Sequence, residues 1–383
     1  GYILAKTSSS FKSYSNISTT LGSLEKRDSN GNYVWNRELL TPSSGLSKAS
    51  SVQICDDGGF IVAGTSTFKN SRSDASLSKI DRDGNIIWVK SFGFGNSNFD
   101  KANSVQICDD GGFIVAGVSD NKAYLFKTDM NGNLIWENKF SMEGPYRETA
   151  NSVQICKDGG FIVAGTAKYN SSGWASFRDN AYLFKTDSNG NLIWEKRFGI
   201  FFNPDNDTIS NEDVPMSANS VQICDDGGFI FTGTSNLTED FSQAYLQKID
   251  SDGHQIWRKY FRLLSHANSL QICDDGGFIL AGQSKFGNAS LLKTDKSGKK
   301  LWQNNFITTD IHIKDHSSVS SVQICSDNGY VMLGTHLIKT NAYGEVYESD
   351  LIEKISSFVE SRINTWQVKG EFEKTSEYQI RVT

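Results

Sequence analysis

The sequence predicts an all-β fold, a seven-bladed β-propeller built from four-stranded antiparallel blades. Two patterns carry this prediction: a fourteen-residue motif that recurs along the chain, and a hairpin pattern that follows each copy. The motif reads SVQICDDGGFIVAG at 51–64 and 104–117, and SVQICKDGGFIVAG at 152–165, with looser copies from residues 220, 269 and 321. Because a repeat array can form one unit of any length, the 383 residues are expected to form a single domain.

Each repeat contains four short apolar runs, which we interpret as strands A to D of one blade. SVQIC is strand A and FIVAG is strand B, and the glycines of the intervening DDGG allow a tight turn. Residues 123–140, AYLFKTDMNGNLIWENKF, then provide strand C, an NGN turn and strand D. Four antiparallel strands that recur in this way are typical of propeller blades.

The number of blades follows from the C–D hairpins. Six of them carry a tryptophan on strand D and the last carries a tyrosine: Trp35, Trp88, Trp136, Trp194, Trp257, Trp302 and Tyr347. The blades are expected near residues 1–49, 50–101, 102–149, 150–217, 218–266, 267–318 and 319–350. Residues 351–375 are expected to form a short amphipathic helix and an additional strand.

The two ends of the chain complement each other. The first repeat lacks strand A, because residues 1–5 align with strand B, whereas SEYQIRVT at 376–383 resembles strand A. We therefore expect the C-terminal strand to complete the N-terminal blade, which removes exposed sheet edges and makes Gly1 and Thr383 neighbours. The alternative is an open solenoid, whose ends would need polar caps.

Composition excludes several classes of function. A formal charge of −6 argues against a nucleic-acid-binding groove, which requires a basic surface. The sequence has no apolar run long enough to span a membrane and no visible signal peptide, so the chain is expected to be processed or trimmed. Six cysteines share one repeat position and show no metal-ligand spacing; they are expected to be buried thiols: Cys55, Cys108, Cys156, Cys224, Cys273 and Cys325.

Other recurring residues are assigned structural roles. The strand D tryptophans are expected to pack against a neighbouring blade, and the strand C lysines are expected to pair with an aspartate of the A–B turn. The DxNGN turns lack the alternating ligands and distal glutamate of a calcium loop, so no metal is expected there. The pair His312 and His316 lacks a third ligand for zinc.

Two sets of residues are candidates for binding. The first is an axial polar ring at the start of strand A, with a solvated funnel as the alternative: Asn103, Asn151, Asn219 and Asn268. The second is an aromatic group in the long loops of the fourth repeat, which could stack on a sugar or anchor a protein, or could instead be buried within its own loops: Trp174, Tyr169, Phe177, Phe201 and Phe202. Five asparagines head glycosylation sequons: Asn16, Asn170, Asn206, Asn236 and Asn288.

The DGGFIVAG motif and the KTDSNGNLIWEK hairpin resemble a group of bacterial and archaeal secreted or cell-surface β-propellers. This resemblance covers nearly all of residues 1–350 and implies an exported module for adhesion or assembly. The hairpin tryptophan is also distantly similar to that of quinoprotein propellers, which implies an axial cofactor site. Those enzymes have eight blades, whereas this chain has seven copies and no adjacent cysteine pair, so no cofactor is expected.

Three functions remain open at this stage. The first is a non-enzymatic, secreted or cell-surface propeller that binds protein or glycan through the face formed by the variable B–C and D–A loops. The second is a structural subunit that self-associates into a lattice or filament. The third is a propeller enzyme or lyase with an axial site, but the repeats supply no cluster of charged or histidine residues there.

Overall fold

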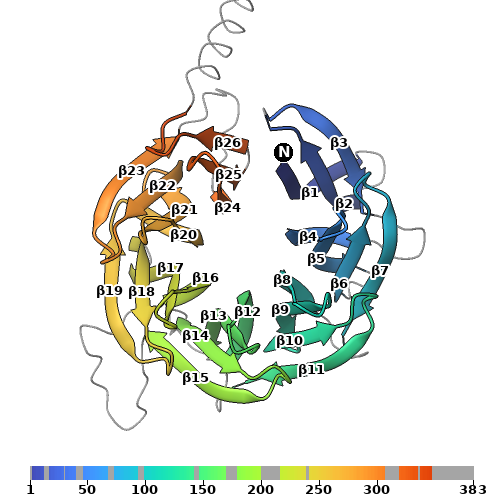
Figure 1. The fold of residues 1–383 in the computed structure, drawn as a ribbon, viewed down its shortest axis with the longest axis horizontal. Coiled ribbons are helices and arrows are strands. Elements are labelled where there is room, and N and C mark those ends of the chain that lie inside the picture. Colours follow the sequence, from blue (N-terminus) through green and yellow to red (C-terminus); the bar gives the residue numbers. More distant parts are fainter. Residues whose placement is uncertain are drawn as a thin grey trace, which may run out of the picture.

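The structure is a computed structural model. It describes residues 2–12, 17–29, 31–39, 46–67, 73–93, 99–141, 146–169, 179–199, 216–238, 241–306, 319–334 and 337–346. All elements in these ranges are strands, and they form seven antiparallel sheets arranged around a central axis (Figure 1). The predicted seven-bladed propeller is therefore confirmed.

The blades follow the chain in order. Their strands are β1 (Tyr2–Lys12), β2 (Ile17–Arg27) and β3 (Tyr33–Glu38) in blade one; β4 (Leu46–Ile54), β5 (Phe60–Thr67), β6 (Ser73–Ile80) and β7 (Ile86–Phe92) in blade two; β8 (Lys101–Ile107), β9 (Phe113–Ser119), β10 (Lys122–Thr128) and β11 (Leu134–Phe140) in blade three; β12 (Tyr146–Ile155), β13 (Phe161–Tyr169), β14 (Asp179–Thr186) and β15 (Leu192–Gly199) in blade four; β16 (Met216–Ile223), β17 (Phe229–Thr238), β18 (Phe241–Ile249) and β19 (Gln255–Phe261) in blade five; β20 (Leu264–Ile272), β21 (Phe278–Ser284), β22 (Ala289–Thr294) and β23 (Lys300–Phe306) in blade six; and β24 (Val319–Ile324), β25 (Tyr330–Gly334) and β26 (Leu337–Thr340) in blade seven.

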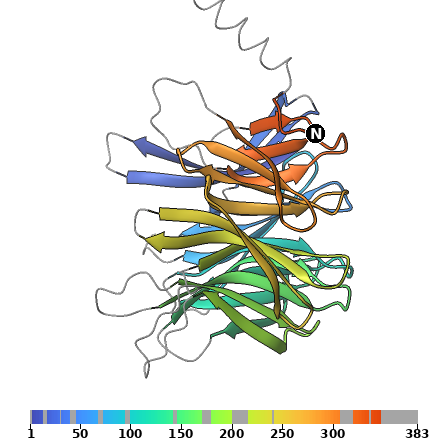
Figure 2. The ribbon, with the colours of Figure 1, turned by 90° about the vertical axis from the view of Figure 1, so that its left-hand side faces the viewer.

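Consecutive strands pair within each blade, so that the first strand of a four-stranded blade is innermost and the last is outermost. Viewed from its side, the ring presents the turns of its blades at two opposite faces (Figure 2). Five blades have four strands, and blades one and seven have three within the described residues. The strand D expected at Tyr347 lies outside that part of the chain.

The A–B turn explains why the repeat requires two glycines. In blade three the first of them, Gly111, has a φ of 76°, which favours glycine. A Cβ atom on the second, Gly112, would lie 2.2 Å from the carbonyl oxygen of Thr128. The preceding Asp110 accepts a hydrogen bond of 2.9 Å from the backbone N–H of Gly112, so the turn fixes a short connection between strands A and B.

The hydrophobic core lies between blades rather than inside one sheet. The cluster between blades three and four combines Ile114 of β9 with Val163 of β13 and Phe184 of β14. Trp136 of β11 lies 5.9 Å, centroid to centroid, from the ring of Phe161 in the next blade. A Cβ atom on Gly190 would lie 2.7 Å from the same tryptophan ring, so only glycine fits there. The expectation that the strand D tryptophans pack against a neighbouring blade is confirmed.

The predicted lysine–aspartate pairs are also present. Six of them join strand C to the A–B turn of the same blade: Lys79–Asp57, Lys127–Asp110, Lys185–Asp158, Lys248–Asp226, Lys293–Asp275 and Lys339–Asp327. Lys293 is nearly buried and donates to both carboxylate oxygens of Asp275 at 2.7 Å. These pairs place the A–B and C–D turns on one face of the ring, which leaves the B–C and D–A connections on the other.

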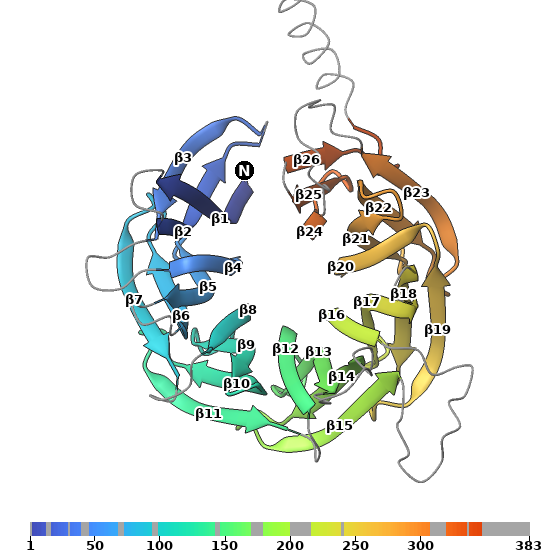
Figure 3. The ribbon, with the colours of Figure 1, turned by 180° about the vertical axis from the view of Figure 1, so that it is seen from behind.

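Blade seven comes next to blade one around the axis, so the seven sheets form a circular array. The hydroxyl group of Tyr2 in β1 interacts with the side chains of Lys339 and Cys325 in blade seven. Tyr330 of blade seven makes the equivalent contact with Cys273 of blade six. Figure 3 shows the first and last blades on the two sides of one opening in the ring. The circular arrangement of the seven sheets shows that the solenoid alternative is wrong. The closing strand predicted at 376–383 and the segment 351–375 lie outside the described residues.

Candidate functional site

The side chains of the axial asparagines form hydrogen bonds between neighbouring blades. Each of them sits at a β-bulge in strand A, where the pairing with strand B shifts by one residue. The bulge directs the side-chain amide to a backbone carbonyl of the next innermost strand. The four bonds are Asn103 to Ala150 (2.9 Å), Asn151 to Ala218 (2.8 Å), Asn219 to Ala267 (2.9 Å) and Asn268 to Val319 (2.7 Å).

The neighbouring serine completes this arrangement. Ser104 Oγ accepts a hydrogen bond of 3.3 Å from the N–H of Val153, and Ser152 accepts an equal one from Val221. The inner edge of each of these strands, which has no further strand to pair with in its sheet, is thus capped by side chains of the preceding blade. The four predicted axial asparagines form blade-to-blade bonds at four consecutive positions, from blade three to blade seven, and their amide donors are used by the scaffold.

The other predicted site residues are only partly covered by the structure. Trp174, Phe177, Phe201 and Phe202 lie outside the described residues, and of Tyr169 only the backbone is described. The sequon residues Asn16, Asn170 and Asn206, and the histidines His312 and His316, also lie outside them. Asn236 lies in β17, and Asn288 directly precedes β22; both are partly exposed.

The cysteines are not arranged for chemistry. All six are unpaired, and four of them are buried as predicted, whereas Cys273 and Cys325 are partly exposed, so the prediction of six buried thiols is wrong for these two. Burial raises the pKa of Cys108, Cys156 and Cys224 to about 11, so these thiols are protonated at neutral pH and are poor nucleophiles. Within the described residues no three His, Cys, Asp or Glu side chains gather as metal ligands. The same part of the chain contains no helix that is long and apolar enough to cross a membrane.

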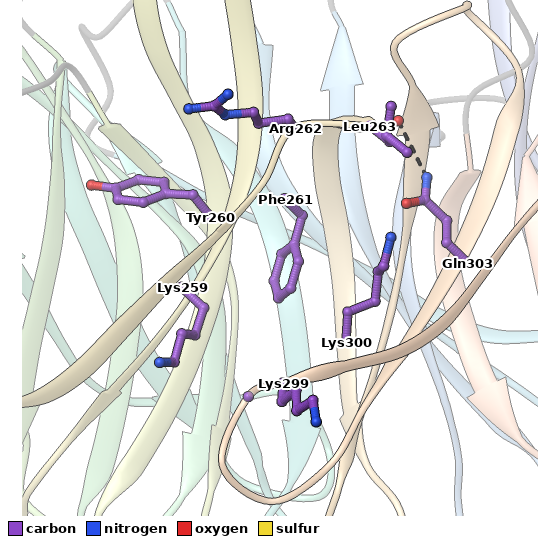
Figure 4. A pocket seen from close by; sticks show the side chains of 9 residues that line it. Lys259, Tyr260, Phe261, Arg262, Leu263, Lys299, Lys300 and Gln303 are labelled. Carbon is purple, nitrogen blue, oxygen red and sulfur yellow. Dashed lines mark hydrogen bonds between the residues drawn. The ribbon is translucent and has the colours of Figure 1, made fainter.

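A groove lies on the outer side of the ring between blades five and six. It has a volume of about 410 Å³ and is lined by the end of β19, by the D–A link and by the C–D turn and strand β23 of blade six: Lys259, Tyr260, Phe261, Arg262, Leu263, Gly298, Lys299, Lys300 and Gln303 (Figure 4). Phe261 forms the floor, since its side chain is buried in the core between the two blades.

The connection between blades leaves this groove uncovered. Strand β19 ends at Phe261 and β20 begins at Leu264, so the D–A link consists of Arg262 and Leu263 alone. The carbonyl oxygen of Leu263 accepts hydrogen bonds from Gln303 Nε2 at 3.2 Å and from the backbone N–H of Lys285 at 3.0 Å. These bonds hold the link against the B–C turn of blade six.

Exposed apolar side chains flank the link. Tyr260 is 40% exposed, Leu263 is 49% exposed, and Phe286 at the tip of the B–C turn is 73% exposed. The ring of Tyr260 is oriented by a hydrogen bond of 3.3 Å from Arg258 Nη1, and Arg258 Nε in turn donates to Gln247 Oε1 at 2.6 Å. We call Tyr260, Leu263 and Phe286 the apolar rim. It lies at the B–C and D–A face, which the sequence predicted as the binding face.

The groove carries positively charged residues at positions where another repeat has neutral residues, and a neutral residue where that repeat has an acidic one. Lys299, Lys300 and Gln303 of blade six correspond to Asn191, Leu192 and Glu195 of blade four. The four cationic lining residues form no ion pair within 4 Å in the described part of the chain: Lys259, Arg262, Lys299 and Lys300. The sequence analysis missed this site. The sequence feature that could have revealed it is KSGKKLWQ at 296–303, which differs from the corresponding segment SNGNLIWE at 188–195.

Comparisons with known proteins identify similar folds but do not assign the chain to a family. No protein-family model matches the sequence, and no curated protein matches it. The WD40 domain of Neurospora crassa Pan2 has a similar structure, with a TM-score of 0.51 and 11% identity over 82% of this chain and 81% of that one. A Bacteroides caccae protein of unknown function has a TM-score of 0.46 and 14% identity over 75% and 90% of the two chains.

A third similar structure is Chaetomium thermophilum Sqt1 bound to the N-terminus of ribosomal protein L10. It has a TM-score of 0.49 and 12% identity, and the match covers 89% of this chain and 82% of that one. At 11% identity the likeness to the Pan2 domain shows the fold alone, and propellers host many unrelated functions. The resemblance to quinoprotein propellers and to secreted or cell-surface propellers stays a prediction.

Proposed function

We propose that the protein is a non-enzymatic β-propeller module that binds a protein or a glycan through the face formed by its B–C and D–A connections. The observation that carries this proposal is the apolar rim of Tyr260, Leu263 and Phe286 beside an open groove. Exposed aromatic and aliphatic side chains on a rigid scaffold are typical of binding surfaces. The hydrogen bonds to the Leu263 carbonyl keep this surface in place before a partner arrives.

The absence of an enzymatic role is part of the proposal, and the use of the reactive side chains supports it. Six of the recurring lysines are paired with aspartates, and four of the six cysteines are buried, with pKa values that burial raises. The axial amides are engaged between blades. These groups are therefore committed to the scaffold, which supports a binding rather than a catalytic role.

The proposed location is the cell surface or the extracellular space, on the resemblance of the repeats. Fractionation of cells that produce the natural protein tests this point, and recovery of all of the protein in the cytoplasm would contradict it.

The rim is tested with the full chain on glycan and protein arrays. Phe286→Ser is expected to lower binding to the best array ligand about tenfold, because a buried aromatic anchor contributes on the order of 1–2 kcal/mol. The matched control is Tyr343→Ser, since Tyr343 is also 73% exposed but lies on the opposite face, in the C–D turn of blade seven. Equal binding by the wild type and Phe286→Ser would refute the proposed surface.

A further inference from the structure

The groove between blades five and six can be compared with the same place elsewhere in the ring. Between blades two and three, Lys90 Nζ donates a hydrogen bond of 2.7 Å to Asn133 Oδ1. The corresponding residues between blades five and six are Lys259 and Lys299. A hydrogen-bonded pair in one groove is thus replaced by two like charges in the other, and like charges placed side by side are unfavourable unless a negative charge joins them.

The lining residues do not supply that negative charge. None of the lining residues is acidic, and Gln303 stands where blades three and four have Glu137 and Glu195. Asp295 lies in the same turn, where hydrogen bonds from Ser297 and the charge of Lys299 lower its pKa, and its Oδ1 accepts hydrogen bonds from the backbone N–H groups of Ser297 at 2.8 Å and Lys299 at 2.9 Å. It is not a lining residue, so it does not occupy the groove. Four cations therefore concentrate at one groove of a chain whose net charge is −6.

The polar groups of the groove specify more than an anion. Gln303 Oε1 is buried and accepts no hydrogen bond from the described residues, whereas its Nε2 is held by Leu263 and Ser290. Figure 4 shows the Gln303 side chain at one side of the groove and the lysines below and beside Phe261. A ligand group that reaches this oxygen has to be a donor, such as a hydroxyl, because carboxylate and sulfate only accept.

We infer that this groove binds an oligosaccharide that carries carboxylate or sulfate groups along its length. The spaced cations would receive successive anionic groups, a ring hydroxyl would donate to Gln303, and the apolar face of a sugar would stack on the oriented ring of Tyr260. An acidic peptide fits less well. A peptide brings no ring hydroxyl for Gln303 and no apolar sugar face for the ring of Tyr260.

This inference rests on the proposed binding function and narrows its ligand. It is tested by titrating the full chain, at low ionic strength, with four probes: an oligogalacturonate, a sulfated dextran oligomer, a neutral dextran oligomer and an oligoglutamate. Binding of at least one of the first two, weakened by added salt, is expected, with no binding of the neutral oligomer. The two anionic sugars distinguish carboxylate from sulfate as the preferred group.

The decisive variant is the double substitution Lys299→Asn with Lys300→Leu, which restores the residues that blade four carries at these positions. It is expected to fold normally and to weaken binding about tenfold, because each exposed charge pair contributes on the order of 0.2–1 kcal/mol. The matched control is Lys48→Leu with Lys157→Asn, which removes two exposed lysines from blades two and four. This control is expected to change the dissociation constant less than twofold, because charges far from the groove are largely screened.

Three outcomes would overturn the inference: binding of neither anionic sugar, equal weakening by both double variants, or equally strong and equally variant-sensitive binding of oligoglutamate. The proposed function fails separately. If the groove variants have no effect but Phe286→Ser still abolishes binding of an array ligand, the face is retained and only the ligand class is wrong.

Discussion

The joint between blades three and four and the joint between blades five and six share one scaffold but differ in how their polar groups are used. In the first, Asn138 Nδ2 donates to the carbonyl of Gly190 at 3.0 Å, Lys139 pairs with Asp120 at 2.5 Å, and Tyr182 donates to Glu195 at 2.6 Å. In the second, three lysines and an arginine line a groove without ion pairs among the described residues. Where the repeat sequence is maintained, the polar side chains form hydrogen bonds and ion pairs with one another. Where the repeat sequence changes, the charged side chains face the groove instead.

The largest expected effect tests the shared scaffold. Trp136→Ala and Trp257→Ala should each lower the free energy of unfolding by about 3 kcal/mol, because both rings fill the same space between a glycine and an aromatic residue of the next blade. Denaturant unfolding measures the change. The control Ile135→Ala, at a side chain that is 55% exposed, should stay within about 0.5 kcal/mol of the wild type. A cost for Trp257→Ala well below that of Trp136→Ala would show that the two joints are not equivalent.

A smaller effect concerns pH. The hydrogen bond from Lys185 holds the pKa of Asp158 below its ordinary value, and Lys127 does the same for Asp110. Because the pKa is lower in the folded state than in the unfolded chain, this stabilisation is present above the unfolded pKa, near 4, and is lost as the pH falls through the folded value.

The midpoint of thermal unfolding should therefore drop as the pH is lowered from about 5 to 2. The variant Asp158→Asn should start from a lower midpoint at pH 7 and lose part of this dependence. An unchanged pH profile in that variant would show that the lysine–aspartate pairs contribute little, in which case both joints depend on their apolar cores alone.

Transferring the groove residues of blade six to blade four tests the difference between the two blades directly. The triple variant Asn191→Lys, Leu192→Lys and Glu195→Gln gives blade four the residues of blade six. If charge at the groove determines binding, this variant should gain a second, weaker site for the anionic oligosaccharide, which calorimetry would measure as an increased stoichiometry. An unchanged stoichiometry would show that the short D–A link, absent from blade four, is also required.

The smallest effect is expected at the long loops of blade four. Trp174→Ala should weaken binding of a partner that uses the variable-loop face by a few fold, and should leave oligosaccharide binding in the groove unchanged. Loss of oligosaccharide binding in this variant would place that ligand at the loops of the fourth repeat instead.

Periodicity made the scaffold predictable. The glycine pair, the strand D tryptophan and the lysine–aspartate pair each recur, and a residue that recurs at every joint has to serve the joints. The role of the axial asparagines was less predictable, because a polar residue at the axis does not reveal the bulge that turns Asn103 toward Ala150. Ligand binding at these residues stays a prediction. The groove was missed because the sequence analysis searched for what recurs, whereas Lys299 and Lys300 are informative as departures.

The bonds at the inner edge have a direction along the chain. In each of the four pairs the asparagine precedes in sequence the carbonyl that it binds, from Asn103 to Ala150 through to Asn268 to Val319. On a ribosome, the group that closes a strand's free edge has therefore already been made when that strand emerges. Growth from the N-terminus can therefore cap the inner edge of each of these four strands as soon as the strand has paired within its own blade.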